Sequence, residues 1–187
     1  MLPSLLHRFD TIESQRRVFL DDLGALSPAQ LAFRPAPDAW SLTDVAQHLT
    51  LVDARTTRVL TERRVTGVPR RAVLDVVYRA RLLDLLWLTH LRVKMPVKGV
   101  APDPAITLTD TTKRWTDART ALRTFLDGMD EAAARAICYR HPVGGYMDIA
   151  DTLHFLEKHH EHHLRQVARL KRAKGYPTPD RSAAGTA

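Results

Sequence analysis

The chain has a single cysteine, Cys138, among its 187 residues. One cysteine excludes an intrachain disulfide and a pair of thiolate metal ligands, which favours a reducing compartment. Long apolar runs are also missing, because the longest, residues 82–91, is interrupted by polar residues and is much shorter than the roughly 20 residues of a membrane span. Arg8 and Asp10 stand where a secretory signal would have its apolar stretch. We therefore expect a cytoplasmic protein without a membrane span.

Alternation of apolar and polar residues with a period of two, typical of half-buried strands, does not extend over any useful length. Helical periodicity instead covers most of the chain. Long helices are predicted over residues 4–23, 42–65, 70–94, 110–128 and 148–174, with short helical segments at 27–34 and 130–137. A proline-rich connection is predicted over 95–107 and a loop over 139–147.

These elements predict an all-α fold, for which an antiparallel helical bundle is the simplest architecture. The length is sufficient for one domain with a sizeable core and no covalent staples, and we place that domain at residues 1–174. Gly175 and Pro177 end the last helix, so residues 175–187 are expected to form a flexible tail. The strongly apolar helix at 70–94 is expected to be buried on more than one side.

The net charge of +7 is concentrated in one segment of the chain. Residues 55–98 contain eleven Arg or Lys against three acidic residues, a local balance of +8. Such a block attracts nucleic acid, anionic lipid or an acidic partner, but it is equally typical of the solvated face of one or two helices. Aromatic residues do not alternate with the basic ones and no recognition motif is present, so we expect no sequence-specific nucleic-acid binding.

Four of the nine histidines lie within five consecutive residues of the last predicted helix: His159, His160, His162 and His163. At about 100° per residue, His163 lies near the centre of the apolar face of that helix, and His159 and His160 lie on its two flanks. A one-turn spacing such as that of His159 and His163 lets two imidazoles share one metal ion. Helix geometry alone does not choose between His159 and His160.

A third imidazole is available on the helix predicted at 42–65, which Ser41 and Asp44 introduce with the spacing of a capping box. His48 lies at the margin of the apolar face of that helix. The simpler alternative is that His163 is a hydrogen-bonded core residue and the other histidines are exposed. Burying several imidazoles without a partner costs about 1–3 kcal/mol each, which favours a shared metal ion of the Zn²⁺ or Ni²⁺ type.

Two motifs resemble those of the DinB-like or YfiT-like superfamily of metal-binding helical bundles. The first is Arg-Pro-Ala-Pro-Asp-Ala-Trp-Ser-Leu-Thr-Asp-Val-Ala-Gln-His-Leu at residues 34–49. The second begins with His-Pro-Val-Gly-Gly-Tyr-Met at residues 141–147 and continues through Leu-His-Phe at 153–155 to His-x-x-x-His-Leu-Arg-Gln at 159–166. Together with the helix order, the resemblance covers nearly the whole chain.

The resemblance implies a four-helix bundle with crossover connections, to which residues 70–94 add an extra apolar helix. It also implies one divalent ion per chain, Zn or Ni, held by His48, His159 and His163. The remaining histidines near these motifs then become neighbours or surface residues: His141, His154, His160 and His162. Trp40 is interpreted as a packing anchor for its loop.

Similar proteins are associated with transfer of low-molecular-weight thiols and with presumed hydrolysis. The resemblance therefore implies a metal-dependent enzyme for a small molecule, either a thiol S-transferase in detoxification or stress response or a hydrolase. Asp53, Gln166 and Tyr146 are candidates for shaping its pocket, although Asp53 is at least as well explained as a solvated helical residue. The alternative is a non-catalytic, metal-stabilised module whose basic block contacts nucleic acid or an acidic partner. Apolar surface on the added helix would suit a homodimer.

Overall fold

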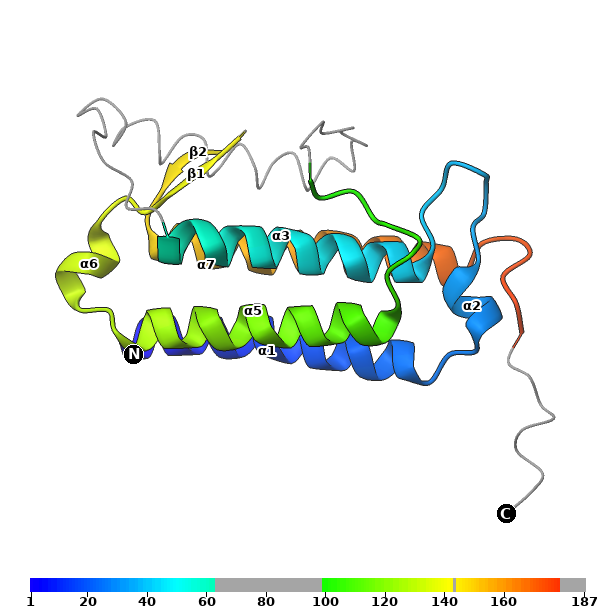
Figure 1. Cartoon of the computed structure of the whole chain (residues 1–187), viewed down its shortest axis with the longest axis horizontal. Helices are drawn as coiled ribbons and strands as arrows, with labels where there is room; N and C mark the ends of the chain where they lie inside the picture. Colours follow the sequence, from blue (N-terminus) through cyan, green and yellow to red (C-terminus); the bar gives the residue numbers. More distant parts are fainter. Residues whose placement is uncertain (63–98, 143, 179–187) are drawn as a thin grey trace, which may run out of the picture.

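The computed structural model describes residues 1–62, 99–142 and 144–178. Four long helices lie side by side along the molecule (Figure 1): α1 (Pro3–Gly24), α3 (Leu42–Glu62), α5 (Leu108–Asp127) and α7 (Ile149–Lys171). α1 and α7 run in one direction and α3 and α5 in the other, and the contacts between helices are most numerous within these two parallel pairs. Parallel neighbours need a connection that crosses the length of the bundle. The fold is therefore the expected four-helix bundle with a crossover between α3 and α5.

Side-chain caps start most of these helices, as the sequence predicted for α3. The Ser41 backbone N–H donates to the Asp44 carboxylate at 2.7 Å, and the Asp44 N–H donates back to the Ser41 hydroxyl at 3.2 Å. Thr107 and Asp110 form the same reciprocal box at the start of α5. The short helices α2 (Pro28–Ala32) and α6 (Glu131–Arg135) lie within the segments where helical turns were expected. A local sequence signal therefore accounts for where the chain enters its helices.

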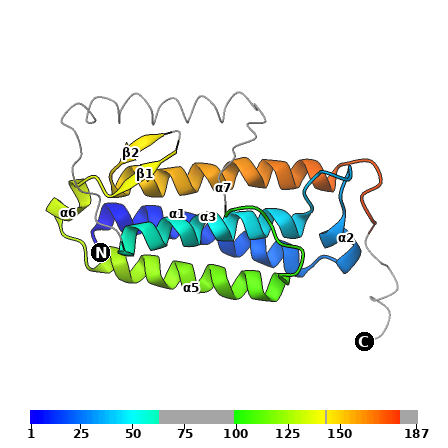
Figure 2. The same cartoon turned by 45° about the horizontal axis from the view of Figure 1, so that its top comes forward.

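One element was wrong in the sequence interpretation. Residues 139–147, expected to be a loop, contain a hairpin of β1 (Tyr139–His141) and β2 (Gly145–Met147), which lies beside the start of α7 (Figure 2). Each strand has three residues, too few for an alternating pattern to be recognised. Gly145, at φ +74°, adopts the left-handed backbone that the tight return requires. The fold remains mostly helical, with this small sheet as its exception.

The remaining predictions concern the helix at 70–94, the basic block and the C-terminal tail. The predicted helix at 70–94, with the dimer contact expected on it, and most of the basic block at 55–98 lie outside the described residues. Residues 175–178, expected in the loose tail, pack on the domain, because Gln30 donates to the Pro177 carbonyl at 3.1 Å and Tyr176 packs edge-on against Phe33. Among the described helices, none has the length and apolar character needed to cross a membrane.

The bundle interior is divided into two hydrophobic clusters along its length. One cluster gathers near the hairpin and contains Leu5, Phe9, Ile12, Leu122, Leu126, Leu153 and Leu156. The other gathers near α2 and contains Phe19, Leu23, Leu42, Leu49, Trp115, Val167 and Leu170. Between them, each long helix contributes buried polar residues, including Arg16, Asp53, Arg119 and His160. The middle of the bundle is thus a polar layer, and the candidate site lies at its level.

Candidate metal centre

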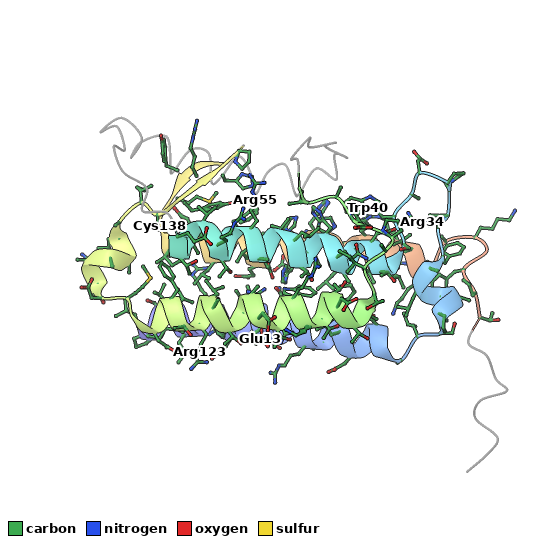
Figure 3. All side chains as sticks on the ribbon, in the orientation of Figure 1. Glu13, Arg34, Trp40, Arg55, Arg123 and Cys138 are labelled. Carbon is green, nitrogen blue, oxygen red and sulfur yellow. The ribbon has the colours of Figure 1, made fainter. Side chains whose placement is uncertain are left out.

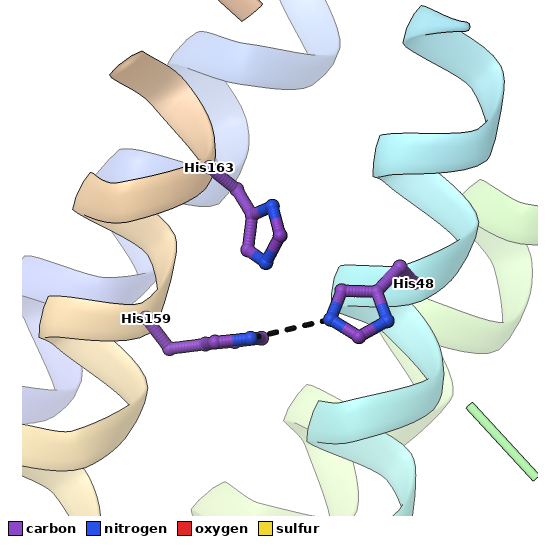
Figure 4. A group of neighbouring side chains, drawn as sticks. All are labelled: His48, His159 and His163. Carbon is purple, nitrogen blue, oxygen red and sulfur yellow. Dashed lines mark hydrogen bonds between the residues drawn. The ribbon is translucent and has the colours of Figure 1, made fainter. Parts of the chain in front are cut away.

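Three of the nine histidines converge between α3 and α7 (Figure 4). His48 projects from α3, and His159 and His163 project from successive turns of α7. One ring nitrogen from each histidine lies within 4.8 Å of the other two. The Nε2 atoms of His48 and His159 are 3.3 Å apart. The structure therefore brings together the three residues predicted as metal ligands.

Hydrogen bonds fix the orientation of two of these rings. His48 Nδ1 lies 2.9 Å from the carbonyl oxygen of Val100, and His163 Nδ1 lies 2.9 Å from the Gln166 side-chain oxygen. Because oxygen can only accept here, each Nδ1 carries the proton and each Nε2 presents its lone pair to the centre. A second hydrogen bond of this kind is what orients metal-binding histidines in proteins. Gln166 was predicted to shape the pocket, and it contacts a ligand candidate directly.

The three imidazoles have lowered pKa values, so they are suited to bind a cation as neutral rings. Burial lowers the pKa of His48, although the hydrogen bond to Val100 opposes this shift. Burial, helped by the charge of His48, lowers the pKa of His163 to about 3. Burial and the neighbouring histidines lower the pKa of His159 well below its usual value. All three rings are therefore neutral near pH 7, which is the form that binds metals.

The donor set fits a divalent metal ion. Two nitrogens bound at 2.0–2.1 Å to a tetrahedral ion lie about 3.3–3.4 Å apart, close to the observed separation of the His48 and His159 Nε2 atoms. Two lone pairs at this separation repel each other unless a proton or a cation lies between them. Coordination of an ion through His159 Nε2 would leave the ring proton on Nδ1, which is covered and has no hydrogen-bond partner in the described structure.

Aromatic rings surround the three imidazoles. The Trp40 indole stacks on His163 with ring centres 6.1 Å apart, and it lies 4.8 Å from His48 at a tilted angle. Trp40 sits with Arg34 where α3 begins (Figure 3). Phe155 stacks on His159 at 5.6 Å. Trp40, interpreted from sequence as an anchor for its loop, therefore also packs against two of the candidate ligands.

The other predicted site residues are placed differently. Tyr146 lies on β2, where its ring faces the Arg140 guanidinium at 5.6 Å, and no ring contact joins it to the three histidines in the described part of the chain. Asp53 was expected at a pocket edge or in solvent; it is only 1% exposed, so the solvated alternative is wrong, and a role in shaping the pocket stays a prediction. His141 and His160, which could have been surface residues, are also buried.

Asp53 belongs to a buried ionic cluster behind the three histidines. Its Oδ2 atom accepts hydrogen bonds from the Trp115 indole N–H and from Arg119 at 2.7 Å, and His160 Nε2 lies 3.2 Å away. Burial alone would raise the pKa of Asp53, but the charges of Arg119 and His160 and the hydrogen bonds lower it. Arg119 and Trp115 were not predicted as site residues, although their spacing of four residues on the apolar face of α5 was an available signal.

A family model described as the DinB superfamily matches residues 11–167. A solved structure, described as "YfiT from Bacillus subtilis is a probable metal-dependent hydrolase with an unusual four-helix bundle topology", superposes with a TM-score of 0.56 at 14% identity. That match covers 95% of this chain and 91% of YfiT, and at this identity it establishes the fold alone. No curated protein matches the sequence significantly.

Proposed function

The chain belongs to the DinB superfamily, and on this basis we propose that it is a metal-dependent enzyme acting on a small molecule. His48, His159 and His163 would hold one divalent ion, Zn²⁺ or Ni²⁺. The observation that carries this proposal is the convergence of three neutral imidazoles from two helices, two of them with Nε2 lone pairs already oriented. A metal-stabilised module without activity would need the same three ligands, so activity requires its own test.

The reaction proposed is attack by an activated nucleophile. His48, His159 and His163 would hold the ion, and the chemistry it would supply is water or a thiol in deprotonated, nucleophilic form. Val100 and Gln166 hold the ligand rings in place, while Trp40 and Phe155 cover them with apolar surface. YfiT is described as a probable metal-dependent hydrolase, which supports hydrolysis. Where the nucleophile is a thiol, we propose that the protein transfers a low-molecular-weight thiol to an electrophile in the cytoplasm. Such a reaction would serve detoxification or stress response.

Metal content is the first test. We expect about one divalent ion per chain in untagged protein by elemental analysis. The ion should be lost in the triple variant His48→Ala, His159→Ala, His163→Ala. His154→Ala is the matched control, because His154 lies on the same helix, half-exposed, and is not one of the three converging histidines. Wild-type protein that binds no ion, even after reconstitution, would overturn the proposed centre.

Activity is tested separately on metal-loaded protein. A panel of esters and amides reports hydrolysis, and consumption of a low-molecular-weight thiol in the presence of several electrophiles reports thiol transfer. Turnover that disappears in the triple variant and persists in His154→Ala would support an enzyme. Bound metal without turnover in either panel would instead favour the non-catalytic module, with the basic block at 55–98 as its contact surface. Binding to nucleic acid that weakens steeply with salt would identify that surface.

A further inference from the structure

The buried ionic cluster lies at the same level of the bundle as the three histidines and joins the same two helices. Asp53 lies a little more than one helical turn after His48 on α3, and His160 is adjacent to His159 on α7. The contact between Asp53 Oδ2 and His160 Nε2, at 3.2 Å, therefore links α3 to α7 directly behind the candidate ligands. Both residues are 1% exposed, so this link is fully inside the protein.

The other two long helices also reach this cluster. Arg119 and Trp115 on α5 both donate to Asp53 Oδ2, and Arg119 lies 3.9 Å from the Glu13 carboxylate on α1. Glu13 in turn accepts a hydrogen bond of 3.0 Å from Arg16. Three donors from two helices thus converge on one oxygen of α3. This arrangement fixes how α3 is rotated and how far it lies from α7.

Stability alone does not explain such a cluster. Replacing a buried ion pair by apolar residues of similar size is often neutral or stabilising, whereas directional polar contacts select one arrangement of the helices. The two hydrophobic clusters, on either side of the polar layer along the bundle, already supply apolar packing. The polar layer occurs where the positions of ring nitrogens on α3 and α7 must be set to within fractions of an ångström.

We propose that Asp53 and His160 are positioning residues for the metal centre. Their contact holds α3 against α7 so that the Nε2 atoms of His48, His159 and His163 lie within reach of one ion before it binds. This inference rests on the metal site under the proposed function. It assigns no catalytic role to Asp53, because the carboxylate is covered and its Oδ2 atom is taken up by Trp115, Arg119 and His160.

His160 is the better residue to change. Removing the Asp53 carboxylate would take from the buried Arg119 its nearer counter-charge, leaving the Glu13 carboxylate at 3.9 Å, and would endanger folding. His160→Phe keeps an aromatic ring but removes the donor, and we expect the contacts of Asp53 with Arg119 and Trp115 to persist because neither hydrogen bond involves His160. His160→Gln restores an N–H donor near the position of Nε2. Leu153→Ala, in the hydrophobic cluster near the hairpin, is the control for a loss of stability on the same helix.

The measurement is the dissociation constant for Zn²⁺, by competition with a chelator, together with the visible absorption spectrum of the Co²⁺-loaded protein. We expect His160→Phe to bind Zn²⁺ about tenfold more weakly, the low end of the range for groups that orient metal ligands. Its Co²⁺ spectrum should also change. His160→Gln should recover most of the affinity and the wild-type spectrum, and Leu153→Ala should keep both while unfolding at lower temperature.

The outcomes separate this inference from the proposed function. Wild-type protein that binds neither ion would remove the metal site and the inference together. Wild-type binding with an unchanged affinity and Co²⁺ spectrum in His160→Phe would leave the metal site intact and overturn the positioning role alone. An equal loss of affinity in Leu153→Ala and His160→Phe would also overturn it, because the effect would then follow stability.

Discussion

At the scale of single residues, the three histidines differ in what holds their rings. His48 is oriented by the backbone carbonyl of Val100, which no side-chain substitution removes. His163 is oriented by the side chain of Gln166, and His159 has Phe155 stacked on it but no hydrogen-bond partner at Nδ1 in the described structure. The contribution of an oriented ring to metal affinity can therefore be measured at one position, Gln166.

Substitution of Gln166 should change metal affinity according to whether an acceptor remains. Gln166→Leu removes the acceptor for His163 Nδ1–H, and we expect a loss of about 10-fold or more in Zn²⁺ affinity. Gln166→Glu keeps an acceptor and makes it anionic, which strengthens the ligand, so affinity should be equal to or above that of the wild type. Competition titration with a chelator measures both, with the exposed neighbour Arg165→Leu as control. Equal affinities in the Leu and Glu variants would contradict the assigned orientation.

Part of this arrangement of the histidines could be predicted from the sequence. Helical periodicity placed His163 inward and left His159 and His160 as alternatives, because both lie close to the apolar face. The structure brings both inward, His159 toward His48 and His160 toward Asp53. Periodicity could not assign these partners, since Asp53 and His160 are 107 residues apart in sequence. Family resemblance chose His159, and that ligand assignment stays a prediction until metal is measured.

At the scale of elements, the helix starts that were predicted correctly depend on local sequence signals. The two residues of a capping box stand three positions apart and bond to each other, so the start of α3 at Ser41–Asp44 could be predicted from this spacing. The hairpin at 139–147 could not, because its strands are short and its two buried positions in β1, Tyr139 and His141, pack against Phe155 of the following helix rather than within the hairpin. Local chemistry thus predicts helix starts better than the contacts that stabilise a short sheet.

The two capping boxes should differ in their importance for stability. Asp44 is buried, accepts from the Ser41 N–H and hydroxyl, and pairs with Arg34 at 2.7 Å. Asp44→Ala leaves these donors without their acceptor, and we expect the free energy of unfolding to fall by about 1–2 kcal/mol. Asp110→Ala removes the same motif at the exposed start of α5 and should cost less. Urea denaturation of both variants measures the difference, and an equal or larger loss for Asp110→Ala would refute it.

At the scale of the whole molecule, the polar layer depends on all four long helices. Helix order and periodicity predicted a bundle, because each helix carries its own apolar face. The layer between the two hydrophobic clusters joins Glu13, Asp53, Arg119 and His160, which come from four different helices. None of these residues is unusual in its own helix, so the layer becomes visible only when the helices are packed.

Buried neutral histidines should make the metal-free fold sensitive to acid, and His141 allows this to be measured away from the candidate ligands. Burial lowers the pKa of His141 to about 4, and its Nδ1 accepts a hydrogen bond of 2.8 Å from the Gly144 N–H. In the unfolded chain this pKa returns to about 6.5. The unfolded state therefore binds the proton first, and the stability present above pH 6.5 is lost progressively as pH falls toward 4.

The expected result is a difference in slope between wild type and His141→Asn, which keeps an acceptor for Gly144 but does not titrate. Between pH 7.5 and 5.5 the free energy of unfolding of the wild type should fall by about 1 kcal/mol more than that of the variant. Urea denaturation in the presence of a chelator, at several pH values, measures this difference without a contribution from bound metal. Parallel pH dependences would show that His141 keeps its ordinary pKa in the folded protein. The acid sensitivity of the fold would then have to arise from the other buried histidines.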